Sequence, residues 1–188
     1  MTAITALWLP ILVAAVIVFI ASSIIHMAPL WHRGECPGLP EQDRIQDALR
    51  PFNLAPGDYM LPRAKDMKSM NAPEFVEKLK RGPVVLMTVI PNGPFTMTKS
   101  LVQWFVYCIV VGIFTAYVTG HALAWGTEYL KVFQIAGATA FIAYAVGLWQ
   151  QSIWYHRAWS MTVKLTFDGL IYALLTGGTF GWLWPAAT

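Results

Sequence analysis

The side chains of this sequence that could do chemistry lie near the ends of its apolar segments. Asp168 is a carboxylate inside the last of these segments, and Lys164 precedes it by about one helical turn. An ionisable residue in a membrane-length apolar segment usually has a binding or proton-handling role. An i,i+4 ion pair between Lys164 and Asp168 would instead be structural, with both side chains extending toward the interface. We favour the structural pair and keep the binding role as the alternative.

Asp168 belongs to a set of polar side chains that we expect at one depth. If the apolar segments cross a bilayer as helices, these side chains form a layer at the inner-leaflet edge of the helices. The layer comprises His26, Gln103, Gln150, Gln151, His156, Lys164 and Asp168. It is the candidate binding site, and no catalytic residue is assigned in it.

Histidines on the same side could also bind a metal ion. The candidate ligands are His26, His32 and His156, joined by Glu35, Cys36 or Asp168. No two of these histidines have a helical ligand spacing such as His-x3-His. We therefore expect interfacial histidines, with no bound metal and no cofactor. His121 falls at the opposite end of its segment from His26, so the two cannot ligate one haem.

Four apolar segments must position these residues. Hydrophobic residues make up 56% of the chain and charged residues 12%, which is about half the charged share of soluble domains. A helix of about 20 residues crosses the ~30 Å hydrocarbon core of a bilayer. The segments are residues 1–25, 100–120, 132–155 and 161–184. They predict an all-α membrane protein with four transmembrane helices in a compact bundle.

The chain divides at its one long polar segment. We expect a first transmembrane helix over residues 1–27, a cytoplasmic loop of about 70 residues over 28–98, and helices 2–4 over 99–188. The first segment lacks a basic stretch before its apolar run, which favours a membrane helix over a signal peptide.

The polar segment contains signals for two short helices. Pro40 predicts the start of the first, which ends near Arg50. Asn71 and Glu74 form a capping box that predicts the second, which Gly82 ends. Two ranges complete the segment: irregular chain at 53–70, and an extended stretch at 84–90 lying against the bundle or the headgroups.

Small residues recur at helical spacing inside the apolar segments. Such stripes let helix backbones approach closely within lipid. They comprise Gly112, Ala116 and Gly120 in the second segment, Ala136, Ala140, Ala143 and Gly147 in the third, and Gly169, Ala173, Gly177 and Gly181 in the last. We expect them to pack helices within the chain, and a homo-oligomer is the alternative.

The placement of Lys and Arg predicts the orientation. Ten of the thirteen lie between Arg33 and Lys99. Arg157 and Lys164 fall on the same side, and only Lys131 falls opposite. Because positive residues stay in the cytoplasm, both termini should lie outside. We expect a bacterial inner membrane.

No motif for nucleophilic catalysis or phosphate binding is present, and a net charge of +3 gives no reason to expect nucleic acid. We therefore expect a non-enzymatic scaffold or accessory subunit in the lipid bilayer, whose cytoplasmic loop binds a partner protein. The main alternative is a small transporter or channel that uses the polar layer around Asp168. A third hypothesis is a lipid-modifying enzyme with His26, His156 and Asp168 as acid and base.

The orientation can be tested by thiol labelling of intact cells. A membrane-impermeant maleimide should fail to label Cys36 and should label a Thr188→Cys variant, because the loop is expected inside and the C-terminus outside. Labelling of Cys36 in sealed cells would reverse the orientation.

Overall fold

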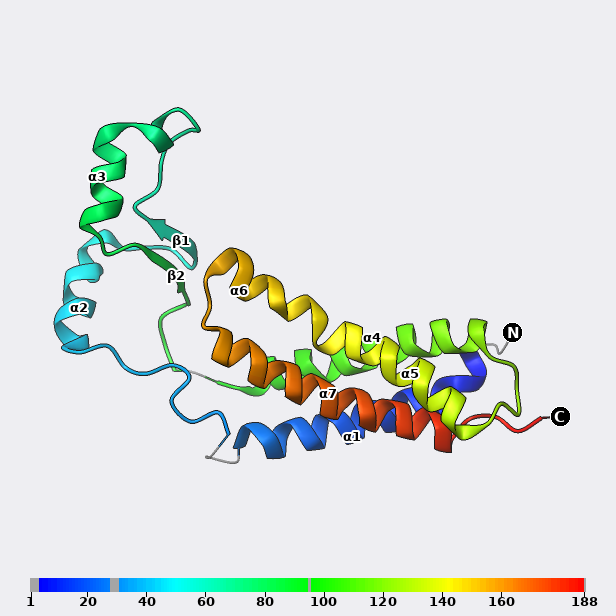
Figure 1. Cartoon of the computed structure of the whole chain (residues 1–188). Coiled ribbons are helices and arrows are strands. Elements are labelled where there is room, and N and C mark those ends of the chain that lie inside the picture. The colour runs from blue at the N-terminus through cyan, green and yellow to red at the C-terminus, as the bar shows by residue number, and fades with distance from the viewer. Residues whose placement is uncertain (1–3, 28–30, 95, 188) are drawn as a thin grey trace. The chain divides into compact units, whose positions relative to one another are not determined.

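The computed structural model describes residues 4–27, 31–94 and 96–187. The chain forms two compact units, one of residues 1–35 and 96–188 and one of residues 36–95. Figure 1 labels their helices and strands. The first unit is a set of long helices, and the second is a small mixed unit with two short helices and a two-stranded sheet.

The first unit is built from apolar helices of membrane length. Among the described residues, three stretches are long and apolar enough to cross a bilayer: Ile4–Met27, Thr98–Ala122 and Tyr129–Tyr155. A fourth long helix, α7, is equally long but contains Lys164, Asp168 and several Thr and Gly residues. The elements are a 3-10 turn (Ile4–Leu7), α1 (Trp8–Met27), α4 (Thr98–Ala122), α5 (Tyr129–Tyr144), α6 (Trp149–Tyr155) and α7 (Trp159–Trp182).

The third predicted segment is not one continuous helix. It is interrupted after Tyr144, where a 3-10 turn over Val146–Leu148 separates α5 from α6. The turn contains Gly147, a poor helix former. The predicted small-residue stripe of this segment is buried only in its first half. Ala136 and Ala140 are fully buried, whereas Ala143 and Gly147 are exposed. The buried face of α5 is instead Val132, Ala136, Ala140 and Tyr144.

Helices α5 and α7 approach at small residues. A Cβ atom built on Gly177 would lie 2.8 Å from the carbonyl oxygen of Phe133 and 3.0 Å from the Cα of Gly137. A Cβ built on Gly169 would lie 2.8 Å from the Cβ of Ala145. Ala173, between these glycines on the same face, is 2% exposed. This close approach fixes which face of α7 turns inward.

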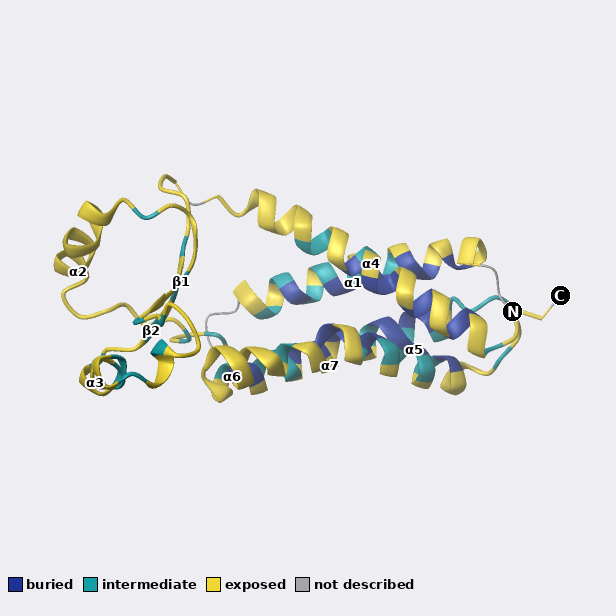
Figure 2. Ribbon diagram, turned by 90° about the horizontal axis from the view of Figure 1, so that it is seen from above, coloured by how far each residue is buried: buried dark blue, intermediate teal, exposed yellow. Residues whose placement is uncertain are grey.

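The outward sides of the long helices are exposed (Figure 2), and many of the exposed side chains are large and apolar. On α1, the side chains of Leu12, Val16 and Ile20 are 43–53% exposed, and on α4 the side chain of Phe114 is 62% exposed. Large apolar surfaces of this kind are covered by lipid in a membrane protein. The exposed pattern therefore agrees with an integral membrane protein.

The second unit contains a sheet that the sequence analysis missed. Its elements are α2 (Gln42–Leu49), a 3-10 turn (Arg50–Phe52), β1 (Gly57–Leu61), a 3-10 turn (Ser69–Asn71), α3 (Pro73–Arg81) and β2 (Val85–Val89). β1 pairs antiparallel with β2, with Gly57 opposite Val89 and Leu61 opposite Val85. The prediction of irregular chain over 53–70 is therefore wrong. The stretch over 84–90 is extended as expected, but its partner is β1.

The capping box predicted for α3 is also absent. The helix begins one residue later than its sequence signal, with Ala72 as its N-cap and Pro73 in its first turn, and no side chain caps it. Asn71 instead ends the preceding 3-10 turn. Proline fixes the first helical φ angle without a lost hydrogen bond, so it starts the helix in place of Asn71.

The close approach of α5 and α7 predicts opposite effects for two adjacent glycines. Gly177→Ala should lower the free energy of unfolding in detergent by ~1–3 kcal/mol, because its methyl group would meet the α5 backbone. Gly178→Ala is the control, since the nearest atom to its Cβ is 3.6 Å away. It should be neutral or stabilising, because alanine is the better helix former. Equal melting temperatures for the two variants would contradict this packing.

Candidate functional site

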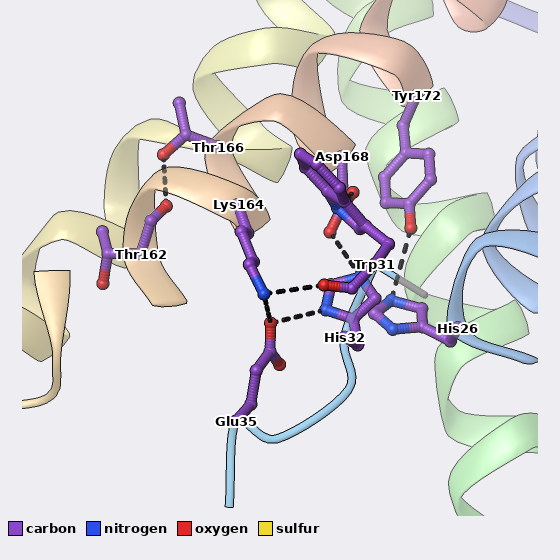
Figure 3. A network of polar contacts seen from close by, with 9 residues as sticks. All are labelled: His26, Trp31, His32, Glu35, Thr162, Lys164, Thr166, Asp168 and Tyr172. Carbon is purple, nitrogen blue, oxygen red and sulfur yellow. Dashed lines mark hydrogen bonds and ion pairs between the residues drawn. The ribbon is translucent and has the colours of Figure 1, made fainter. Parts of the chain in front are cut away.

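The candidate site is a closed polar network centred on Asp168 (Figure 3). Asp168 lies on the inward face of α7 and is 2% exposed. Its neighbours come from the end of α1 and from the segment Trp31–Glu35, which turns back at Gly34, whose φ of +82° suits glycine. All of these residues belong to the helical unit.

Both oxygens of Asp168 are covered by this segment. The indole Nε1 of Trp31 donates a 2.9 Å hydrogen bond to Oδ1. Nε2 of His32 lies 3.1 Å from Oδ2, but without the alignment of a hydrogen bond. A buried carboxylate needs such partners, because its desolvation is costly. Trp31 and His32 therefore close the site over Asp168.

Glu35 and Lys164 hold His32 and Trp31 in place. Nδ1 of His32 lies 2.8 Å from Oε1 of Glu35. Nζ of Lys164 donates a 2.7 Å hydrogen bond to the Trp31 carbonyl oxygen and lies 3.5 Å from Oε1 of Glu35. The Lys164–Asp168 ion pair that we favoured from the sequence is therefore not formed in the described structure, where each residue contacts other groups. Lys164 neutralises Glu35, and Asp168 faces Trp31 and His32.

His26 completes the network from the last turn of α1. Its ring stacks on that of His32, with centroids 4.3 Å apart. The Tyr172 hydroxyl, on α7 one turn after Asp168, lies 3.5 Å from Nε2 of His26. Three side chains of the network each offer one possible metal-ligand atom: His26, His32 and Asp168. These three atoms lie within 4.8 Å of one another, close enough to bind one metal ion.

The predicted polar layer divides into two parts. His26, Lys164 and Asp168 lie in the network. The other members are exposed, and in the described residues no side-chain hydrogen bond or ion pair joins them to it; they are Gln103, Gln150, Gln151 and His156. Trp31 and Tyr172 were not predicted as site residues, and His32 and Glu35 were predicted only as candidate metal ligands. The i,i+3 spacing of His32 and Glu35 was the available signal.

The predicted packing stripes lie at helix contacts of the same unit. Ala116 is fully buried, Gly112 faces Ile11 of α1, and Gly120 is buried near the end of α4. On α7, Gly181 faces the ring of Tyr129. The Gly112 contact joins α4 to α1, and the Gly181 contact joins α7, which carries Asp168, to α5.

No protein-family model matches this sequence, and no curated protein and no solved structure is significantly similar to it. The network can bind a cation or join α7 to the segment Trp31–Glu35. Because Asp168 is 2% exposed, it does not present a carboxylate to a substrate in this structure.

The network predicts that Asp168 matters more for stability than an exposed acid. Asp168→Asn should lower the free energy of unfolding in detergent by ~1–3 kcal/mol, because it removes a buried charge-assisted acceptor. The control is Glu128→Gln, which also changes a carboxylate to an amide. Glu128 pairs with Lys131 at the surface, where the two side chains are 75% and 64% exposed. This control should cost less than ~1 kcal/mol. Equal losses would contradict the network.

Proposed function

We propose that this chain is a four-span, non-enzymatic scaffold or accessory subunit of a membrane complex, and that residues 36–95 bind its partner protein. In this proposal α7 is the fourth transmembrane helix. Both termini face outward, residues 36–95 lie in the cytoplasm, and the membrane is a bacterial inner membrane.

The contacts of Lys164 and Asp168 support α7 as a fourth span. Charged groups inside a membrane are tolerated when they face the bundle interior and are paired. Asp168 meets Trp31 and His32, and Lys164 meets Glu35 and the Trp31 carbonyl. Neither charge then needs lipid contact. With 24 residues, α7 also has the length to cross a bilayer.

The partner-binding role depends mainly on one observation: no described residue of the second unit is fully buried. Small units need a well-buried core or an added partner for stability. Yet large apolar side chains lie open here, such as Phe52 at 70%, Ile90 at 60% and Leu86 at 45% exposure. Exposed apolar groups in such numbers are typical of interaction surfaces.

The sheet offers a defined surface for that partner. Leu86 on β2 is opposite Met60 on β1, and both are 45% exposed. Met87 and Tyr59, the next pair in register, are partly buried and face the other side. A two-stranded sheet also has two unpaired edges, to which an extended peptide can add. Met60 and Leu86 are therefore the proposed centre of the docking surface.

The closed state of Asp168 favours the scaffold over the transporter, channel and lipid-enzyme hypotheses. Those functions need a pocket or path that reaches the carboxylate. Here the side chains of Trp31 and His32 cover both of its oxygens.

Site-specific photo-crosslinking in living cells tests the docking role. A photoreactive amino acid at Leu86 should give one discrete protein adduct, and Met60→Asp in the same chain should abolish it. The control is the same probe at Asp47 on α2, whose side chain is 65% exposed and polar. Identical adducts at both positions, or none at Leu86, would contradict the proposal. An adduct between two copies would make the partner a second copy of this chain, against an accessory role.

A further inference from the structure

Asp168 has one carboxylate oxygen without a suitable partner. Oδ1 accepts the hydrogen bond from Trp31, whereas Oδ2 is buried and makes no hydrogen bond to the described residues. A buried anionic oxygen left in this state costs considerable free energy. Nε2 of His32, 3.1 Å away, is likewise buried and makes no hydrogen bond to the described residues.

The other contact of His32 determines what Nε2 offers. Nδ1 lies 2.8 Å from Glu35, and an ionised carboxylate can only accept, so Nδ1 carries the hydrogen. In the neutral ring, Nε2 then carries a lone pair, and the atom lies 3.1 Å from Oδ2. Two acceptors at that distance repel each other. A positive species between them resolves the conflict, either a second proton on His32 or a metal cation.

The alignment favours the metal cation. A proton on Nε2 would lie along the fixed N–H direction of the ring, which is not aligned with Oδ2, so it would not form a hydrogen bond with that oxygen. Two ligands of one metal point at a common centre instead of at each other. With metal–ligand bonds of ~2.0–2.2 Å and angles of ~90–109° between them, two adjacent ligand atoms are ~2.8–3.6 Å apart. The separation of 3.1 Å between Nε2 and Oδ2 falls in this range.

The third ligand and the outer contacts complete the pattern. His26 brings a ring nitrogen within 4.8 Å of the other two ligand atoms. Each ligand also has an outer polar contact: His32 with Glu35, Asp168 with Trp31, and His26 with Tyr172. Metal-bound histidines almost always donate their second N–H to a carboxylate, carbonyl or water, and metal-bound carboxylates are themselves hydrogen-bonded.

We propose that His26, His32 and Asp168 bind one divalent first-row transition metal ion of the Zn²⁺ or Fe²⁺ class. Two imidazoles and one carboxylate suit such ions, whereas Mg²⁺ and Ca²⁺ prefer all-oxygen sites. Three protein ligands leave at least one position for water. The ion joins the end of α1 and the segment Trp31–Glu35 to α7. This site is independent of the docking role of residues 36–95.

Metal binding by the purified full chain in mild detergent tests this site. The background is Cys36→Ser, because Cys36 is an exposed free thiol and thiolates are themselves metal ligands. After chelator treatment and addition of Zn²⁺, mass spectrometry should find about one equivalent retained per chain, and Co²⁺ should give visible d–d absorption. Zn²⁺ should also raise the melting temperature.

Ligand and control variants make the result specific. His32→Gln and Asp168→Asn should lose the bound ion and the rise in melting temperature. His121→Gln is the control, because that side chain contacts the Tyr117 carbonyl oxygen elsewhere on α4 and should leave both unchanged. Should the ligand variants fail to fold, Trp31→Phe keeps all three ligands and should weaken Zn²⁺ binding by ~10–100-fold. Equal Zn²⁺ binding by Trp31→Phe and His121→Gln, or less than a stoichiometric ion in the parent chain, would overturn the proposal.

Discussion

The burial of the Asp168 carboxylate constrains the whole end of the helical unit around it. The side chain is 2% exposed on a helix that otherwise buries small and apolar residues. A buried charge needs hydrogen-bond donors or a cation nearby. The groups that contact the two oxygens of Asp168 do not come from α7. The chain must therefore return after α1 so that Trp31 and His32 cover the two oxygens. Lys164, one turn before Asp168, then stabilises this return by contacting Glu35 and the Trp31 carbonyl.

The small-residue packing of α5 against α7 and the buried carboxylate depend on each other. Gly169, Ala173 and Gly177 bring α7 close to α5, and Asp168 and Tyr172 share the inward side of the helix. A rotation of α7 that opened the glycine contacts would also move the carboxylate away from His32. The apolar surfaces of α1 and α4 outside these contacts remain for lipid. The polar network and the close packing therefore specify one orientation of α7.

The sequence predicted the helical character because charge-free runs of membrane length are unambiguous. It also singled out Asp168 and Lys164, since ions inside such a run are rare. It did not predict their partners: an i,i+4 pair can be seen in one helix, whereas Trp31 and His32 are more than 130 residues away from Asp168. We predicted four further polar residues at the same depth as Asp168, but their side chains are exposed, whereas that of Asp168 is buried; they are Gln103, Gln150, Gln151 and His156. The β1–β2 pairing was missed because strand β1 lies between turn-forming Gly and Pro residues.

A double-mutant cycle between Trp31 and Asp168 measures the central interaction most directly. The free energies of unfolding of the parent chain, Trp31→Phe, Asp168→Ala and the double variant would be measured in one detergent. If the indole donates to the buried carboxylate as the 2.9 Å contact indicates, the two substitutions should be coupled by ~1–3 kcal/mol. The double variant should then lose less than the sum of the single variants. Additive losses within ~0.3–0.5 kcal/mol would mean that the two side chains do not interact, and would contradict the network around Asp168.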